Sequence, residues 1–205
     1  MIGATGISTV SADSLTPSDE SSIKADMIAA LNRNMFDKCM ELALKIPDDA
    51  EAQFVIGGLY LNGLGVDQSF EEAEKWLTKS AEQDNSDAQC LLGLLYCNGE
   101  GVTKNYFEAF KWFSRSAENG NPQAQFELGL MYKNGEGTVA NSSKAVEWYR
   151  KSAEQGYAQA QCNLGVMYIN GTGVEKNEKE GIKWLKKAAE QGNQTAVNNL
   201  KKLGY

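Results

Sequence analysis

The side chains that could carry covalent chemistry in this sequence are four cysteines, because the chain contains no histidine. Without an imidazole there is no Ser-His or Cys-His pair, and the commonest general base and metal ligand is missing. Cys90 and Cys97 lie seven residues apart on one predicted helix, about 10 Å along its axis, which is too far for a disulfide. No two cysteines have metal-binding spacing. We therefore expect Cys39, Cys90, Cys97 and Cys162 to be free thiols in a reducing compartment.

Two further patterns resemble reactive motifs. Adjacent carboxylates occur at Asp48-Asp49 and Glu71-Glu72, but both pairs lie at predicted helix starts, where the helix dipole favours negative charge. Gly-x-Gly triplets such as that ending at Gly65 suggest a phosphate loop, yet a dinucleotide fingerprint needs a preceding strand, and here a helix precedes. We interpret both patterns as structural and expect no catalytic residue, no metal site and no cofactor. The alternative is an enzyme or small-cofactor binder that uses the cysteine thiols.

The elements that must position these residues follow a repeat of 36 residues. Alanine, glycine, tyrosine and tryptophan recur at this interval with no insertion or deletion. The recurring positions are Ala52, Ala88, Ala124, Ala160 and Ala196; Gly57, Gly93, Gly129 and Gly165; Tyr60, Tyr96, Tyr132 and Tyr168; and Trp76, Trp112, Trp148 and Trp184. A fixed period of this length is typical of stacked supersecondary units, none of which can bury its apolar face alone. Such an array favours binding over catalysis.

Each repeat is predicted to hold two helices joined by a loop. Asparagines such as Asn85 stand at the expected N-cap of a first helix, and Gly63 and its copies follow the helix end, where glycine can adopt the left-handed conformation. The mid-helix glycines, such as Gly57, each cost about 1 kcal/mol relative to alanine. They are therefore expected to allow close approach of the second helix. The small residues predicted opposite them are Ala73, Ala109, Ala145 and Gly181.

The sequence predicts an all-α fold with four parts. Residues 1–21, rich in Ser, Thr, Gly and Asp without periodicity, are expected to form a disordered tail. Residues 22–48 predict a capping helical hairpin, and residues 193–205 predict a C-terminal capping helix. Residues 49–192 hold the four repeats, which run over 49–84, 85–120, 121–156 and 157–192.

The repeated unit has the pattern A-x-Q-x-x-(L/I)-G-x-x-Y-x-N-G-x-G-(V/T), followed by A-x-x-W-x-x-x-(S/A)-A-E. In the second repeat the pattern is carried by Gln89, Leu92, Gly93, Tyr96, Asn98, Gly99, Gly101, Val102, Ala109, Trp112, Ala117 and Glu118. It resembles the Sel-one-like repeat, a relative of the tetratricopeptide repeat, over residues 49–205. The resemblance implies an α-solenoid, a right-handed superhelix of antiparallel helix pairs, that acts as a non-catalytic scaffold or adaptor. A cysteine-rich branch of that family has disulfides at positions that here hold Glu82 and Gln89, so those disulfides are not expected.

Charge and hydropathy limit the partners. The net charge of −7 argues against nucleic acid, because neutralising phosphates needs a basic face. No apolar run approaches the roughly 18 residues of a membrane span, and no secretory signal is recognised at the start. We expect a soluble, cytoplasmic protein, with a non-standard secretion route left open. Residues 1–51 carry nine acidic and four basic groups, and residues 173–205 carry four and seven, which raises the alternative of a weak head-to-tail self-association.

The expected contact surface is the concave side, which first helices line in arrays of this kind. Positions three before, one after and four after the mid-helix glycine fall on one helix face. They predict a partner-binding groove made of Phe54, Leu61, Cys90, Leu94, Cys97, Phe126, Leu130, Lys133, Cys162, Val166 and Ile169. Such a groove would accept an apolar segment of a protein or peptide partner. The alternative is that curvature buries part of this stripe between neighbouring repeats. Cys90 and Cys162 are interpreted as small apolar fillers.

Overall fold

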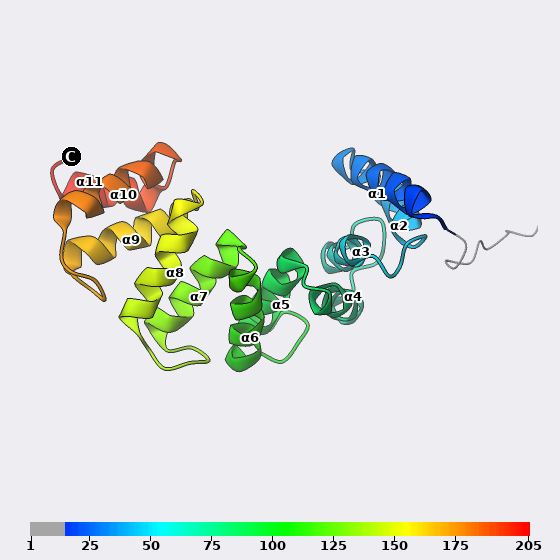
Figure 1. The fold of residues 1–205 in the computed structure, drawn as a ribbon, viewed down its shortest axis with the longest axis horizontal. Helices are drawn as coiled ribbons and strands as arrows, with labels where there is room; N and C mark the ends of the chain where they lie inside the picture. Colours follow the sequence, from blue (N-terminus) through cyan, green and yellow to red (C-terminus); the bar gives the residue numbers. More distant parts are fainter. Residues whose placement is uncertain (1–14) are drawn as a thin grey trace, which may run out of the picture. The chain divides into compact units, whose positions relative to one another are not determined.

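The computed structural model describes residues 15–205, and over that range it contains eleven α-helices and no strand (Figure 1). The helices are α1 (Pro17–Asn32), α2 (Phe36–Ala43), α3 (Ala50–Asn62), α4 (Phe70–Glu82), α5 (Ser86–Asn98), α6 (Tyr106–Glu118), α7 (Pro122–Asn134), α8 (Ser142–Glu154), α9 (Ala158–Asn170), α10 (Glu178–Glu190) and α11 (Gln194–Lys202). The predicted all-α class is confirmed.

The described part of the chain divides into two compact units, which meet between residues 80 and 81 in the sequence. In the first unit, α2 packs against both α1 and α3. Their buried side chains form one core cluster that includes Met27, Cys39 and Ile56.

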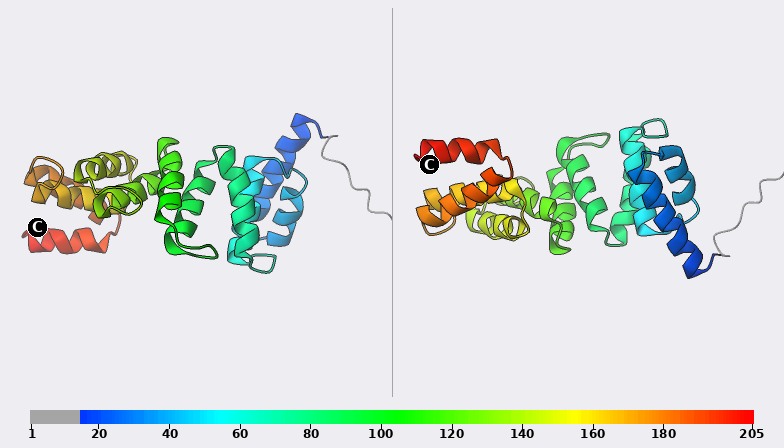
Figure 2. Two further views of the ribbon diagram at one scale, coloured as in Figure 1. Left: turned by 90° about the horizontal axis from the view of Figure 1, so that it is seen from below. Right: turned by 90° about the horizontal axis from the view of Figure 1, so that it is seen from above.

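In the second unit, each helix from α5 to α11 packs against the next one along the chain. Figure 1 shows this succession from green to red, and Figure 2 shows α11 beside α10 at the end of the unit. Helix pairs that contact only their neighbours are typical of an α-solenoid, which confirms the predicted fold class.

The first helix begins earlier than predicted. Residues 17–21 were expected to belong to a disordered tail, but they form the first turns of α1. The Thr16 backbone N–H donates to Asp19 Oδ2 at 3.1 Å, and the Asp19 N–H donates to Thr16 Oγ1 at 3.3 Å. This capping box, with Pro17 at the first helical position, starts a helix within a polar segment. The rest of the predicted tail, residues 1–14, lies outside the described residues.

The predicted helix ends are confirmed. The side-chain oxygen of Asn85 accepts a hydrogen bond from the Ala88 N–H at 2.9 Å, and Asn121 and Asn193 cap their helices in the same way. Left-handed glycines follow the first helices, with φ between 63° and 76°; they are Gly63, Gly99, Gly135 and Gly171.

The mid-helix glycines do allow close approach, but the opposing residue differs from the prediction. A Cβ atom at Gly93 would lie 2.6 Å from the Phe113 ring, and one at Gly129 would lie 2.7 Å from the Tyr149 ring. These side chains lie one turn after the alanines predicted to oppose the glycines, on the same helix face. Gly181 does meet its glycine, since its carbonyl oxygen would lie 2.8 Å from a Cβ at Gly165.

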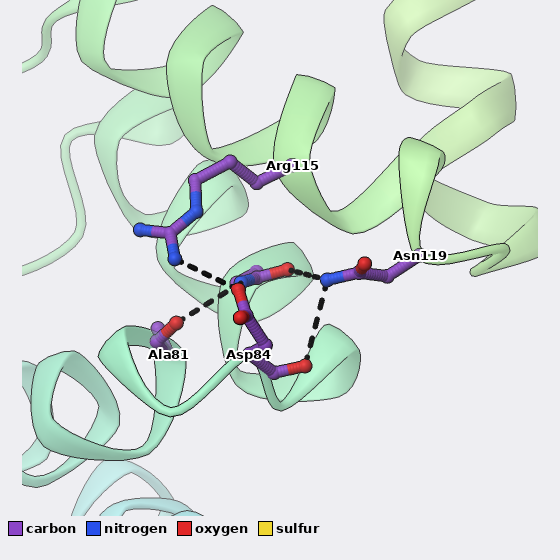
Figure 3. A network of polar contacts seen from close by, with 5 residues as sticks. Ala81, Asp84, Arg115 and Asn119 are labelled. Atoms are coloured by element: carbon purple, nitrogen blue, oxygen red, sulfur yellow. Dashed lines mark hydrogen bonds and ion pairs between the residues drawn. The ribbon is translucent and has the colours of Figure 1, made fainter.

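A glutamine in each of the later first helices ties that helix to its neighbours. Gln89 Nε2 donates to the Ala81 carbonyl oxygen at 3.0 Å, and Gln89 Oε1 accepts from Asn119 Nδ2 at 3.1 Å. Asp84 extends this network by accepting from Arg115 at 2.8 Å (Figure 3). Because the glutamine is buried, these bonds satisfy polar groups that water cannot reach. The same bonds recur at Gln125 and Gln161.

Candidate functional site

The eleven predicted groove residues lie on the first helices α3, α5, α7 and α9, and they differ in exposure. Cys90 and Cys162 are buried, with 4% and 3% of their surface exposed. Lys133 is exposed. The other eight are half-buried; they are Phe54, Leu61, Leu94, Cys97, Phe126, Leu130, Val166 and Ile169. The two buried cysteines therefore pack the interior, and the half-buried side chains keep a surface that a partner could cover.

The half-buried residues of the second unit belong partly to the core between repeats. The Phe126 ring lies 5.8 Å from the Tyr149 ring and 5.4 Å from the Tyr157 ring. Leu130 packs on the same cluster of buried residues. The stripe is therefore partly buried between repeats and partly exposed, whereas binding of a partner there stays a prediction. We call Leu94, Cys97, Leu130, Val166 and Ile169 the first-helix row.

The thiols are held in their neutral form. Burial raises the pKa of Cys90 to about 12, and the carboxylates of Glu127 and Asp87 add to the effect. Burial also raises the pKa of Cys97, Cys162 and Cys39. A thiol is a weak nucleophile and metal ligand until it ionises. In the described part of the chain, no group of three or more His, Cys, Asp or Glu side chains could hold a metal ion.

One cavity of about 220 Å³ lies within the second unit and brings together three of the predicted residues, Lys133, Cys162 and Val166. Met167 also lines it. The other lining residues are all polar; they are Tyr149, Asn163, Asn170, Thr172 and Thr195. They come from α8, α9, the loop after α9, and α11. The sequence placed these three predicted residues on the groove-facing sides of two first helices, Lys133 on α7 and the other two on α9. It did not predict that α8 and α11 would close a cavity around them.

Tyr149 is the unusual residue in this cavity. The side chain is fully buried, and its hydroxyl has no hydrogen-bond partner within the described residues. Burial raises the pKa of Tyr149 well above its ordinary value. The Asn163 side chain approaches the hydroxyl without meeting hydrogen-bond geometry and lowers the pKa in part, and the nearby Glu127 carboxylate raises it. A buried polar atom without a partner destabilises the fold. The other three repeats avoid that cost, because the same position holds Leu77, Phe113 and Leu185.

A second polar position on the first helices was missed by the sequence analysis. Two residues before the mid-helix glycine, the four repeats hold Val55, Leu91, Glu127 and Asn163. Burial raises the pKa of Glu127, and nearby Glu136 raises it further. Glu127 forms no ion pair among the described residues. The sequence does contain a signal for this site, because the position is polar in the last two repeats and apolar in the first two.

The Sel1 repeat model matches four consecutive segments, residues 50–85, 86–121, 122–157 and 158–193. The chain belongs to the Sel1 repeat family. Each matched segment starts one residue after the corresponding predicted repeat. Sel1 repeat proteins generally act as scaffolds for protein interactions, and Sel1 repeats typically carry no catalytic site.

Solved structures agree with this family. The chain is similar to a Sel1 repeat protein from Oxalobacter formigenes, with 31% identity and a TM-score of 0.82 over 92% of this chain and 81% of that one. It is also similar to c5321, a protective antigen of uropathogenic Escherichia coli with an SLR fold, with 32% identity and a TM-score of 0.79. That match covers 87% of this chain but only 40% of the antigen.

A putative Sel1 repeat protein from Klebsiella pneumoniae shares the fold, with 19% identity and a TM-score of 0.57 over 91% of this chain and 94% of that one. A comparison with curated proteins found no match. None of the helices described between residues 15 and 205 is long and apolar enough to cross a bilayer.

Proposed function

We propose that this Sel1 repeat protein is a non-catalytic adaptor that binds a segment of a protein partner, mainly through the concave face lined by its first helices. The observation that carries the proposal is the first-helix row, whose apolar side chains are only half-buried. Covering apolar surface contributes about 25 cal/mol for each Å² removed from water. The row therefore offers binding energy that the fold itself has not used.

The test compares charge substitutions on the row with one elsewhere. Leu94→Glu combined with Leu130→Glu places two carboxylates on α5 and α7, where an apolar partner segment would have to desolvate them. The control is Phe107→Glu on α6, because Phe107 is a large apolar residue that is 76% exposed and lies outside the row. Each variant and the wild-type protein serve as bait for co-purification with mass spectrometry.

We expect the double variant to lose at least tenfold of the captured partner, which corresponds to about 1.4 kcal/mol, with unchanged helical circular dichroism. Phe107→Glu should capture as the wild type does. Equal capture by the double variant and the wild type would exclude the row as the binding surface.

The alternative of a thiol-dependent enzyme or cofactor binder is tested on the purified protein. Because burial raises the pKa of all four thiols, alkylation at pH 8 should be slow, with half-buried Cys97 reacting before Cys90. A stoichiometric metal or haem, or a fast-reacting Cys90, would contradict the adaptor proposal.

A further inference from the structure

Three polar exceptions to the repeat pattern meet in the cavity described above. Tyr149 replaces Leu or Phe, Asn163 replaces Val or Leu at its position in the first two repeats, and Lys133 replaces Leu, Cys or Ile. All three line the same volume of about 220 Å³, although they come from three helices, α8, α9 and α7. Tyr149 and Lys133 each stand where the other three copies are apolar, and Asn163 stands where two of the other copies are apolar. Their meeting in one cavity indicates a shared ligand.

The polar groups of the cavity are largely unused by the fold. Among the described residues, Lys133 forms no ion pair, and the Tyr149 hydroxyl forms no hydrogen bond although it is buried. The side chains of Thr172 and Thr195 form none either. Native structures satisfy most buried polar groups, so a buried hydroxyl left without a partner calls for a physical reason. A ligand that enters the cavity would supply the missing partners.

The size and charge of the cavity select the kind of ligand. Pockets for drug-sized molecules span about 300–1,000 Å³, so this cavity is suited to one side chain of a longer segment. Its lining contains one charged group, the Lys133 ammonium, and neutral hydrogen-bond donors from hydroxyl and amide groups. Because the pKa of Tyr149 is raised, its hydroxyl stays protonated and can donate. A carboxylate, which only accepts hydrogen bonds, matches this set of donors.

We propose that this cavity binds the carboxylate of an aspartate or glutamate in the partner segment, with Lys133 as the counter-ion and Tyr149 and Asn163 as hydrogen-bonding groups. The inference rests on the proposed partner-binding function and adds to it the chemistry of one anchor. Val166 belongs to the first-helix row and also lines the cavity, so an apolar segment lying on the row would carry its acidic residue directly into this site.

The probe is N-acetyl-glutamate N-methylamide, titrated into the full chain and followed by NMR of the backbone amides and of the methyl groups of Val166, Met167 and Thr195. The uncharged control ligand is N-acetyl-glutamine N-methylamide, which has the same shape. We expect the glutamate probe to shift these signals with an affinity in the millimolar range, and the glutamine probe to bind at least fivefold more weakly.

Variants then assign the contacts. Lys133→Met should weaken the glutamate probe about tenfold, whereas Lys201→Met, which removes an exposed lysine of α11 outside the cavity, should leave it unchanged. Tyr149→Phe should weaken it about fivefold while the melting temperature stays the same or rises, because the removed hydroxyl has no partner in the fold. Glu127→Gln should tighten binding about twofold by removing a nearby negative charge.

No shift at these methyl groups, equal affinity for the two probes, or equal effects of Lys133→Met and Lys201→Met would overturn the acidic anchor. These outcomes do not depend on co-purification of the partner. If the protein captures its partner through the first-helix row but does not bind the glutamate probe, the acidic anchor alone is refuted. If the protein binds the probe, but the variant with Leu94→Glu and Leu130→Glu captures as much partner as the wild type does, the first-helix row alone is refuted as the binding surface.

Discussion

At the scale of single residues, the repeated positions carry the fold and the varying positions carry the information about binding. A mid-helix glycine is needed in each repeat because a Cβ there would overlap the opposing side chain. Gly93 faces the Phe113 ring, and Gly129 faces the Tyr149 ring. The periodicity alone predicted that close approach. It could not predict Tyr149 as part of a site, because that role depends on which helices close the cavity. Asn163 was not predicted, because it does not occupy one of the three helix positions expected to face the groove.

The steric role of the mid-helix glycine can be tested on α3, where two glycines are adjacent. A Cβ at Gly57 would lie 2.7 Å from Leu77 Cγ, whereas one at Gly58 would meet nothing within 4 Å. Gly57→Ala should therefore destabilise the fold by about 1–3 kcal/mol through overpacking. Gly58→Ala should stabilise it by about 0.5–1 kcal/mol through better helix propensity. Urea unfolding measures both, and equal effects at the two positions would disprove the steric explanation.

At the scale of helices, capping and buried amides decide where elements begin and how they stay in register. The Asn caps and left-handed glycines were predictable because their signals lie within a few residues of each helix end. The start of α1 was not, since Thr16 and Asp19 form their capping box inside a segment whose composition is typical of disorder. The role of Gln89 was also missed, because its partners lie on preceding and following helices.

The glutamine network gives a prediction at this scale. Gln125 Nε2 donates to the Ala117 carbonyl oxygen at 3.1 Å, and Gln125 Oε1 accepts from Gln155 at 2.8 Å. Gln125→Leu removes both bonds, at about 0.5–1.5 kcal/mol each, so it should cost about 1–3 kcal/mol in total. Gln123→Leu, in the first turn of α7 and only half-buried, is the matched control and should change stability by less than about 0.5 kcal/mol. Chemical denaturation followed by circular dichroism distinguishes them, and similar losses would refute a role of the network in register.

At the scale of the whole molecule, the chain is a Sel1 repeat protein whose repeats were recognisable from spacing alone. The predicted period, helix count per repeat and family resemblance all follow from residues that recur within one sequence. The site is less predictable, because half-burial of the first-helix row and closure of the cavity both depend on packing between repeats. Charge is also uneven along the chain, with an excess of acidic groups in residues 1–51 and of basic groups in residues 173–205.

This charge asymmetry underlies our proposal of a weak head-to-tail self-association. Attraction between exposed charges is screened within about 8 Å at physiological ionic strength. Any association should therefore be detected by static light scattering at low salt and a protein concentration of about 0.1 mM, which is high enough to populate a weak complex. It should disappear as the salt concentration rises. A mass that equals the monomer at every salt concentration would rule self-association out.

The central claim is that the first helices bind the partner segment, and hydrogen exchange of the captured complex tests it most directly. Amide protection on adding the partner should increase in α5, α7 and α9, and most strongly around Leu94, Leu130 and Val166. The backbone amides of the second helices α6, α8 and α10 should exchange at the same rates as in the free protein. Protection confined to those second helices, with α5, α7 and α9 unchanged, would contradict the account.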